Sequence, residues 1–81
     1  MTRVRTRILE GEPLTYDGTN AREVEAFAGD LYAGIEAGCP VILNDDGTET
    51  LMSPGWRLVR WDGGGLTVFA PGAARLLLED A

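Results

Sequence analysis

The sequence of 81 residues contains no histidine and no lysine, and these absences exclude most of the common catalytic chemistry. Histidine is the most frequent proton shuttle and metal ligand in proteins, and lysine supplies the amine of Schiff-base enzymes. The single cysteine, Cys39, has no histidine to activate it, so we expect a small buried side chain there and no nucleophile. The sequence therefore predicts no catalytic residue, no metal and no cofactor, and hence a protein that is not an enzyme.

The chain also lacks a second cysteine and any long apolar stretch. A lone cysteine cannot form a disulfide within the chain, whereas small secreted domains usually depend on several disulfides. Residues 1–7 are followed by no apolar core of the kind found in secretory signals. No stretch approaches the roughly 20 apolar residues of a membrane span. We therefore expect a cytoplasmic protein without a membrane partner.

The chain has few positive charges: it contains seven arginines and 13 acidic residues, so its formal net charge is −6. A negative field repels phosphate backbones, so we expect no nucleic-acid partner. The acidic surface is explained most simply by solubility. Contact with a basic protein is the alternative interpretation.

A chain of this length predicts one domain, residues 1–81, and its 44% of hydrophobic residues is typical of globular proteins. Folding hides only about 60% of the unfolded surface at this size, so the core is thin. We expect self-association into a homo-oligomer, because contacts between copies would extend such a core.

Alternation of apolar with charged residues predicts a half-buried strand over residues 3–9. Val4, Thr6 and Ile8 would lie on its buried side, and the arginines between them on the other. The Glu-Gly-Glu-Pro segment at residues 10–13 is expected to end this strand, because glycine and proline interrupt regular structure.

Helical spacing follows Asn20, a good N-cap residue, with Glu23 three positions later as its capping-box partner. A helix is expected to begin there. Tyr32 and Ile35 extend its apolar stripe, so that it could continue to Ile35 despite two glycines. The predicted core-facing residues of this helix are Val24, Phe27, Ala28 and Leu31.

Glycine-containing turns divide the second half of the chain into short strands. Pro71 then opens a short C-terminal helix, because the first helical position needs no backbone N–H, and this helix is expected to end in residues 79–80. The sum is an α+β fold: a small, mainly antiparallel sheet of four to five strands with one packed helix and a short C-terminal helix. The predicted strands of the second half are residues 41–44, 48–52, 56–61 and 66–70.

Arg3, Arg5 and Arg7 form a row in the predicted N-terminal strand. Alternate residues of a strand lie about 7 Å apart on one side, so three guanidinium groups could pair with phosphates or with an acidic partner surface. The alternative is a solvated strand face, or a charged edge that prevents aggregation.

A second candidate binding surface is the strand at residues 56–61. Alternation places Trp56 and Arg60 on one side and Arg57 and Trp61 on the other. Tryptophan and arginine are enriched at binding hot spots, so this strand offers anchors to a protein or a planar ligand. The alternative is that at least one tryptophan packs in the core.

Two motifs carry a resemblance to a known family. Residues 17–27 read Asp-Gly-Thr-Asn-Ala-Arg-Glu-Val-Glu-Ala-Phe, and residues 53–61 read Ser-Pro-Gly-Trp-Arg-Leu-Val-Arg-Trp. They resemble the Gly-Asp/Thr-Asn-Ala-x-Glu-Val-x-x-Phe helix start and, in part, the Ser-Pro-Gly-Asp-Trp-Ile-Ile-Arg-Gly strand of small phage- and prophage-encoded proteins of unassigned function. The resemblance implies a bacteriophage accessory protein.

Two functions are consistent with these features. The first is a non-enzymatic phage protein that binds a host protein in the cytoplasm of the host cell, as a homo-oligomer. The alternative is a protein that binds a small nucleotide-like anion between subunits. In that case Arg5, Arg57 or Arg60 would hold the phosphate, and a tryptophan would stack on the base.

Overall fold

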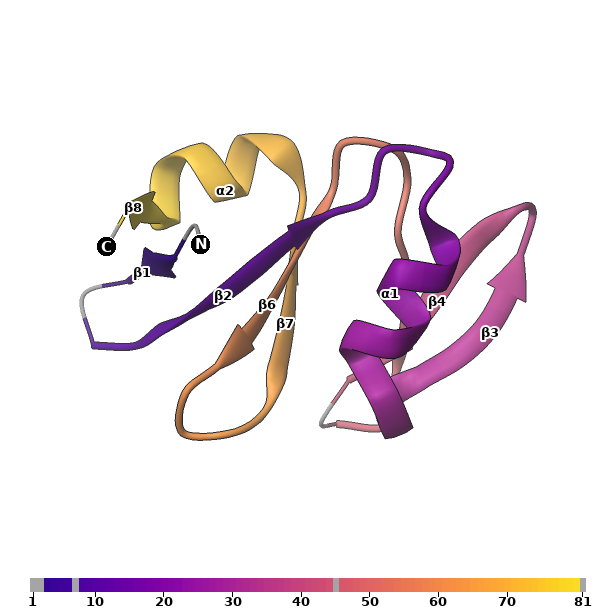
Figure 1. Cartoon of the computed structure of the whole chain (residues 1–81), viewed down its shortest axis with the longest axis horizontal. Coiled ribbons are helices and arrows are strands. Elements are labelled where there is room, and N and C mark those ends of the chain that lie inside the picture. Colours follow the sequence, from indigo (N-terminus) through magenta and orange to yellow (C-terminus); the bar gives the residue numbers. More distant parts are fainter. Residues whose placement is uncertain (1–2, 7, 45, 81) are drawn as a thin grey trace.

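The computed structural model describes residues 3–6, 8–44 and 46–80, and it shows an α+β fold made mainly of sheet (Figure 1). The described residues form two antiparallel sheets, one of five strands and one of three, together with two α-helices. The predicted fold class is thus confirmed, with the strands divided between two sheets. Within these ranges, neither helix is long and apolar enough to cross a membrane.

The larger sheet has the strand order β7-β6-β2-β1-β8. The N-terminal strands β1 and β2 therefore lie between β6 and the C-terminal strand β8. Neighbouring strands are antiparallel, and β2 pairs with β6 from Gly11 opposite Trp61 to Thr15 opposite Arg57. Helix α2 (Pro71–Leu77) connects β7 to β8 and begins with the predicted proline. The strands are β1 (Val4–Arg5), β2 (Glu10–Thr15), β6 (Arg57–Trp61), β7 (Leu66–Phe69) and β8 (Glu79–Asp80).

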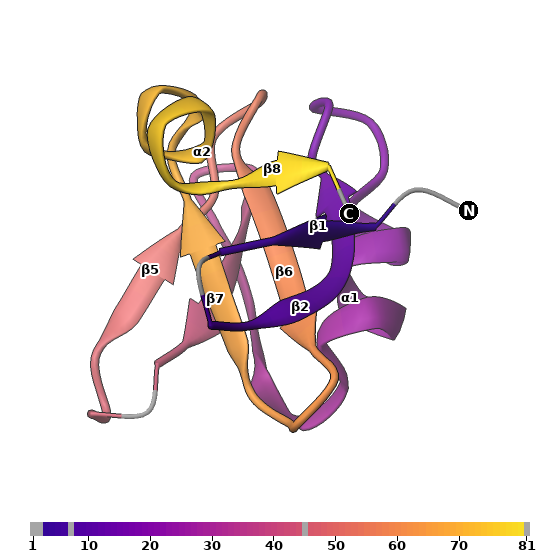
Figure 2. The ribbon, with the colours of Figure 1, turned by 90° about the vertical axis from the view of Figure 1, so that its left-hand side faces the viewer.

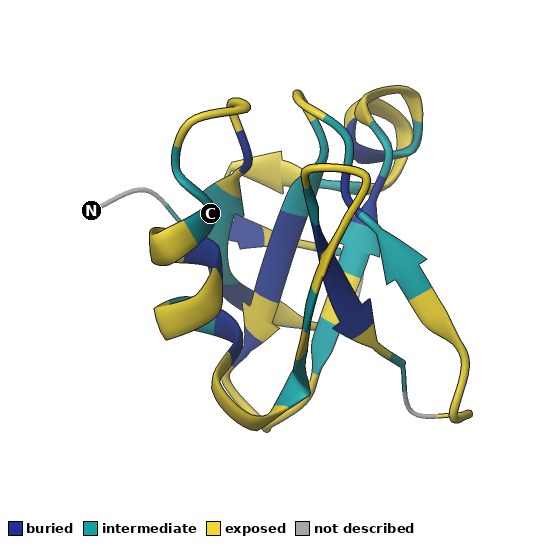
Figure 3. Cartoon of the chain, turned by 90° about the vertical axis from the view of Figure 1, so that its right-hand side faces the viewer, coloured by how far each residue is buried: buried dark blue, intermediate teal, exposed yellow. Residues whose placement is uncertain are grey.

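The smaller sheet, in the order β3-β4-β5, packs with helix α1 (Ala21–Ala28) on the other side of the molecule (Figure 1). The helix buries Val24 and Ala28, as its spacing predicted, and leaves its outer surface exposed (Figure 3). A 3₁₀ turn, η1 (Gly29–Leu31), leads from α1 into this sheet. Its strands are β3 (Tyr32–Glu36), β4 (Cys39–Leu43) and β5 (Glu49–Leu51).

The strand predicted over residues 3–9 is wrong in its second half. After the two residues of β1 the chain turns, and the backbone N–H of Thr6 donates to the carbonyl oxygen of Leu9 at 2.7 Å. The side-chain oxygen of Thr6 also accepts from the backbone N–H of Leu9 at 3.1 Å, which holds the turn. Ile8 is therefore 88% exposed and does not share the buried side of Val4.

The prediction that residues 10–13 end a strand is also wrong, because they begin β2. Gly11 permits the close pairing of this strand, since a Cβ atom there would collide with the carbonyl oxygen of Arg60 on β6. β1 pairs with β2 only at Glu10 and Gly11, so it does not reach Pro13. The missing N–H of Pro13 therefore removes no hydrogen bond between β1 and β2. Residues 79–80, expected to end the C-terminal helix, likewise form a strand, β8, against β1.

The helix that follows Asn20 ends at Ala28 and does not reach Ile35. Gly29 adopts a φ of +59°, a left-handed conformation that suits glycine and stops the helix. The chain then passes through η1 into β3, so Tyr32 and Ile35 lie on a strand. The apolar stripe therefore continues beyond the helix in a different element.

Asn20 precedes α1 as predicted, but its side chain does not cap the helix. Its Oδ1 accepts from the backbone N–H of Asp17 at 2.9 Å, and its Nδ2 donates to the carbonyl oxygen of Thr15 at 2.9 Å. Because the helix start has no side-chain cap hydrogen bond, the predicted capping box with Glu23 is wrong. Asn20 instead fixes the loop between β2 and α1.

Strand β6 lies between two hydrophobic cores. Leu58 belongs to the core that α1 and the smaller sheet share, here called the α1 core, and Val59 belongs to the core beside α2, called the α2 core. Both side chains are fully buried, so both sides of this central strand are covered. The buried residues of the α1 core are Tyr16, Val24, Ala28, Ile42, Met52 and Leu58, and those of the α2 core are Val4, Val59, Trp61, Phe69 and Ala74.

Candidate functional site

Arg3 and Arg5, the two described members of the predicted arginine row, each bind a carboxylate. In Arg3, Nε lies 3.1 Å from Oε2 of Glu10, and Nη2 lies 2.5 Å from Oδ2 of Asp62. These hydrogen bonds raise the pKa of Arg3, with the bond to Asp62 contributing most. In Arg5, Nε lies 3.3 Å from Oε1 of Glu79.

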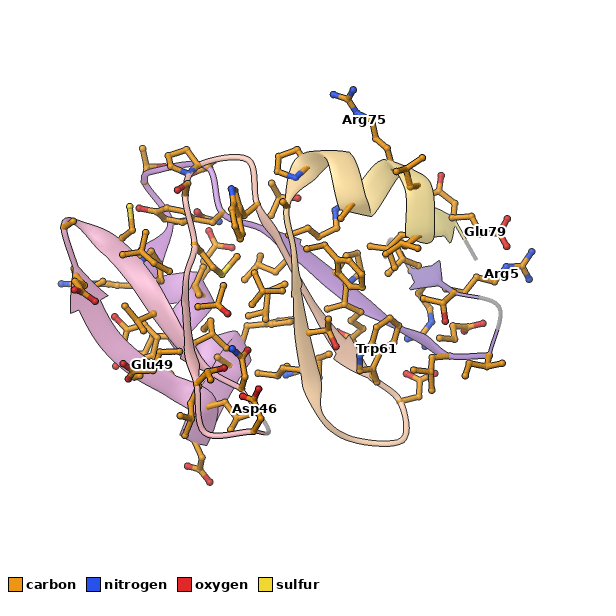
Figure 4. All side chains as sticks on the ribbon, turned by 180° about the vertical axis from the view of Figure 1, so that it is seen from behind. Arg5, Asp46, Glu49, Trp61, Arg75 and Glu79 are labelled. Carbon is orange, nitrogen blue, oxygen red and sulfur yellow. The ribbon has the colours of Figure 1, made fainter. Side chains whose placement is uncertain are left out.

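These ion pairs tie the larger sheet together. Arg3 links the start of β2 to the turn between β6 and β7, and Arg5 links β1 to β8. Figure 4 shows Arg5 and Glu79 side by side at one end of the molecule. Both arginines are engaged within the chain, so an anion would have to displace a carboxylate to bind either one. Arg7, the third predicted member of the row, lies outside the described residues.

The two tryptophans lie on opposite sides of the strand, as alternation predicted. Trp61 is buried in the α2 core, where its ring meets that of Phe69 edge to face at 6.2 Å and its Nε1 donates to Oγ1 of Thr67 at 2.9 Å (Figure 4). Trp56 is half-buried against the α1 core. The interpretation that at least one tryptophan packs in the core is confirmed. Because the rings belong to different cores, they do not bracket one ligand.

Arg60 lies in a cleft between the end of α1 and the β6–β7 hairpin. Its guanidinium carbon is 4.4 Å from the centre of the Phe27 ring, and Nη2 is 3.2 Å from Oε2 of Glu12. Asp30 and Asp62 also line this cleft, whose volume is about 530 Å³. Because Arg3 also pairs with Asp62, the three carboxylates face two arginines and the cleft keeps a net negative charge, which opposes the binding of a phosphate there.

Arg57 and Arg75 line a smaller hollow of about 280 Å³ between β6 and α2. Thr15 contributes a third polar side chain, and no carboxylate is among the described residues around this hollow. Its charge suits an anion. Its volume is below the usual range of about 300–1,000 Å³ for small-molecule sites, so it fits a phosphate or carboxylate group better than a whole nucleotide.

A third hollow is an apolar groove of about 620 Å³, lined by Phe69, Leu76, Leu77 and the turn residues Thr6 and Ile8. Leu76 is 86% exposed and Leu77 is 59% exposed. We call these five residues the apolar end. Figure 2 faces this part of the molecule and shows α2, β7 and the turn after β1 around it.

The apolar end is not among the surfaces predicted above, although the sequence contains a signal for it. Residues 76–78 are three consecutive leucines at the end of a helix of seven residues, Pro71–Leu77, and one side of this short segment cannot bury all of them. The helix turns Ala74 into the α2 core, with Leu78 packed beside it, which leaves Leu76 and Leu77 outside. Ile8 joins them because the predicted strand stops early and becomes a turn.

Charge is distributed unevenly between the two sides of the molecule. Residues 17–52, which include α1 and the smaller sheet, hold eight acidic residues and one arginine, a net charge of −7. The rest of the chain holds five acidic residues and six arginines, a net charge of +1. We call residues 17–52 the acidic lobe. Figure 4 shows Glu49 of this lobe on the other side of the molecule from Arg5 and Glu79, and Asp46 at the lower edge between them.

The seven described carboxylates of the acidic lobe are exposed to solvent. All four ion pairs found among the described residues use carboxylates outside residues 17–52. Two acids of the lobe hold tight turns instead: Asp17 accepts hydrogen bonds from Thr19, and Asp46 accepts them from Thr48, at 2.6–2.9 Å. The threonine hydroxyls contribute most to lowering the pKa of both aspartates, and the backbone N–H groups add to the effect.

Within the part of the chain that the structure describes, no three acidic or cysteine side chains come together as a metal site. The geometry thus offers hollows of different character, among them an acidic cleft, a small cationic hollow and the apolar groove. Comparison of the chain with models of known protein families, with curated proteins and with solved structures finds no match.

Proposed function

We propose that the protein acts by binding another protein chain at its apolar end, and not by catalysis. The supporting observation is that Ile8, Leu76 and Leu77 are each more than half exposed around one groove. Burying an aliphatic side chain of this size contributes about 1.5–3 kcal/mol, so a partner that covers the groove gains free energy at each of them. Contiguous exposed apolar surface on a protein marks an interaction site.

The resemblance to phage-encoded proteins suggests where such contacts take place. A phage accessory protein meets the proteins of its host in the host cytoplasm, and a host protein is accordingly part of the proposal. The acidic lobe leaves a second surface for such a partner, because its seven described carboxylates are exposed. A basic host protein would be attracted there, and raising the ionic strength would weaken that attraction.

Photo-crosslinking in bacterial cells tests the proposal at single positions. A benzophenone amino acid is placed at Leu76, and in a matched chain at Ile35, which is 54% exposed but lies on β3 in the acidic lobe. Irradiation should yield discrete protein adducts from position 76, several times more than from position 35. Equal yields from the two positions, or none from position 76, would contradict the proposal.

A second candidate function is the binding of a small anion, and the hollow beside Arg57 and Arg75 supports it. Trp61 lies in the α2 core, and Ala74 and Leu78 of that core also line this hollow, so the fluorescence of Trp61 reports on this region. Titration with inorganic phosphate and with a nucleotide should change the emission of the native chain, and the Arg57→Gln variant should lose the change. No response to either compound would exclude this function.

A further inference from the structure

We infer that the apolar end binds a second copy of this chain and forms a two-fold dimer; this inference rests on the proposed function. In a two-fold interface the same patch of each copy meets itself, so the patch must be complementary to its own shape and charge. Three features of the apolar end favour such an interface: the shape of its surface, the charged side chains at its border and its distance from the acidic lobe.

The surface of the apolar end has a ridge with a hollow on each side. A second hollow of about 370 Å³ adjoins the apolar groove, and Thr6, Leu76 and Leu77 line both of them. These residues therefore form a ridge between two depressions, and Leu76 on this ridge is 86% exposed. Two copies related by a two-fold axis can each place this ridge in a hollow of the other. A flat patch would lack this fit.

The charges around the patch are also self-complementary. The second hollow is bordered by one cation, Arg75, and one anion, Glu79. Figure 4 shows the Arg75 side chain extending outward from α2. Glu79 already pairs with Arg5 through Oε1, but its side chain is 66% exposed, so when the patch meets its copy the Arg75 of each molecule can also approach the Glu79 of the other. A patch with charges of one sign would repel itself.

The acidic lobe favours association at the apolar end over other modes. Two lobes of −7 repel when they approach, but they lie at the far ends of a dimer built from molecules 33 Å long. That length exceeds the screening distance of about 8 Å at physiological ionic strength. Pairing of β8 with its copy is disfavoured, because Glu79 and Asp80 would lie opposite like charges.

The available area sets the expected affinity. A standard interface takes about 800 Å² from each partner, or roughly a sixth of the 5,099 Å² of accessible surface of this chain. The molecule is only 23 × 22 Å across its long axis, so its end supports an interface at the lower limit of that range. We therefore expect a reversible dimer with a dissociation constant on the order of micromolar.

Sedimentation velocity of the purified chain over concentrations from about 1 to 500 μM tests the inference. The wild type should change from monomer to dimer across this range. Ile8→Gln and Leu76→Gln should each raise the dissociation constant at least about tenfold, because a two-fold interface contains every substitution twice. Ile35→Gln makes the same chemical change on the acidic lobe and should leave the constant within about twofold.

The possible results separate this inference from the proposed function. A wild type that stays monomeric at the highest concentration overturns the dimer, as does an Ile35→Gln effect equal to that of Ile8→Gln. Adducts of twice the chain mass from the benzophenone at position 76 support the dimer. If position 76 forms adducts only with other proteins and the purified chain is monomeric, the dimer is overturned and the proposed function stands. If position 76 forms no adducts at all, both are overturned. Circular dichroism of each variant confirms that these exposed substitutions leave the fold unchanged.

Discussion

Replacing Leu58 by alanine tests whether the two cores unfold as one unit. Leu58 is fully buried in the α1 core, and its neighbour Val59 is fully buried in the α2 core. Leucine-to-alanine changes at such sites cost about 2–5 kcal/mol, because they remove apolar contacts and leave a cavity. A domain of this length has a stability of roughly 4–12 kcal/mol, at about 0.05–0.15 kcal/mol per residue. Leu58→Ala should therefore remove a large part of the free energy of unfolding.

The assay is urea unfolding followed by the fluorescence of Trp61, in a Trp56→Phe background that leaves one tryptophan, in the α2 core. With a urea dependence of about 1–3 kcal/mol/M, a loss of about 3 kcal/mol lowers the midpoint by roughly 1–3 M. Because Leu58 and Val59 adjoin on β6, we expect Trp61 to report the full shift, at the midpoint given by circular dichroism. A Trp61 transition that keeps its original midpoint would refute the reasoning, since it would mean that the cores unfold independently.

Three further substitutions test local features. Gly11→Ala should lower the free energy of unfolding by about 1–3 kcal/mol, since its Cβ meets the backbone of β6; urea unfolding measures this. Thr67→Val removes the acceptor of the Trp61 indole N–H and should cost about 1–3 kcal/mol in the same assay. Hydrogen bonds from Thr48 lower the pKa of Asp46 in the folded state, so their contribution is present above the ordinary aspartate pKa of about 3.9 and is lost as pH falls through the lowered value. Thr48→Val should thus lower the melting temperature by more at about pH 6 than at about pH 2.

Matched controls accompany these substitutions. Gly63→Ala places a methyl group where nothing lies within 4 Å, so its effect should stay within about 0.5 kcal/mol. An equal loss at both glycines would contradict the argument for close strand pairing. Thr67→Ser and Thr48→Ser keep the hydroxyl groups and should keep most of the stability. Loss of stability in Thr48→Val that is the same at both pH values would mean that the carboxylate is not involved.

Much of the second half of the fold can be predicted from the sequence, because its signals are local. Proline at the first position of α2 and the glycine turns between strands act within a few residues. The first half is harder, since its alternation continues through Thr6 and Ile8 although the strand has already ended. What ends it is a turn that Thr6 holds by hydrogen bonds to Ile8 and Leu9, and alternation carries no information about that turn. The apolar stripe of α1 likewise runs on into β3, because a period of three to four residues does not reveal where Gly29 reverses its φ.

The candidate site depends on contacts between distant parts of the chain, and the sequence alone could not supply them. Arg3 pairs with Asp62, 59 residues away, so this described member of the predicted arginine row is engaged in an internal ion pair that the local sequence does not reveal. Arg60 meets Glu12, 48 residues away, and so lies in a negative cleft. The sequence showed that Leu76 was apolar, but only the direction in which α2 packs shows that this leucine remains outside.

The uneven distribution of charge gives the molecule a permanent electric dipole, whose negative pole is the acidic lobe. On a cationic support, such as an amine-coated sensor or an anion-exchange resin, the protein would adsorb with this pole downward. The leucines of α2 would then point into the liquid on every adsorbed molecule. A uniformly oriented layer would thus form without chemical tethering, and salt would release it.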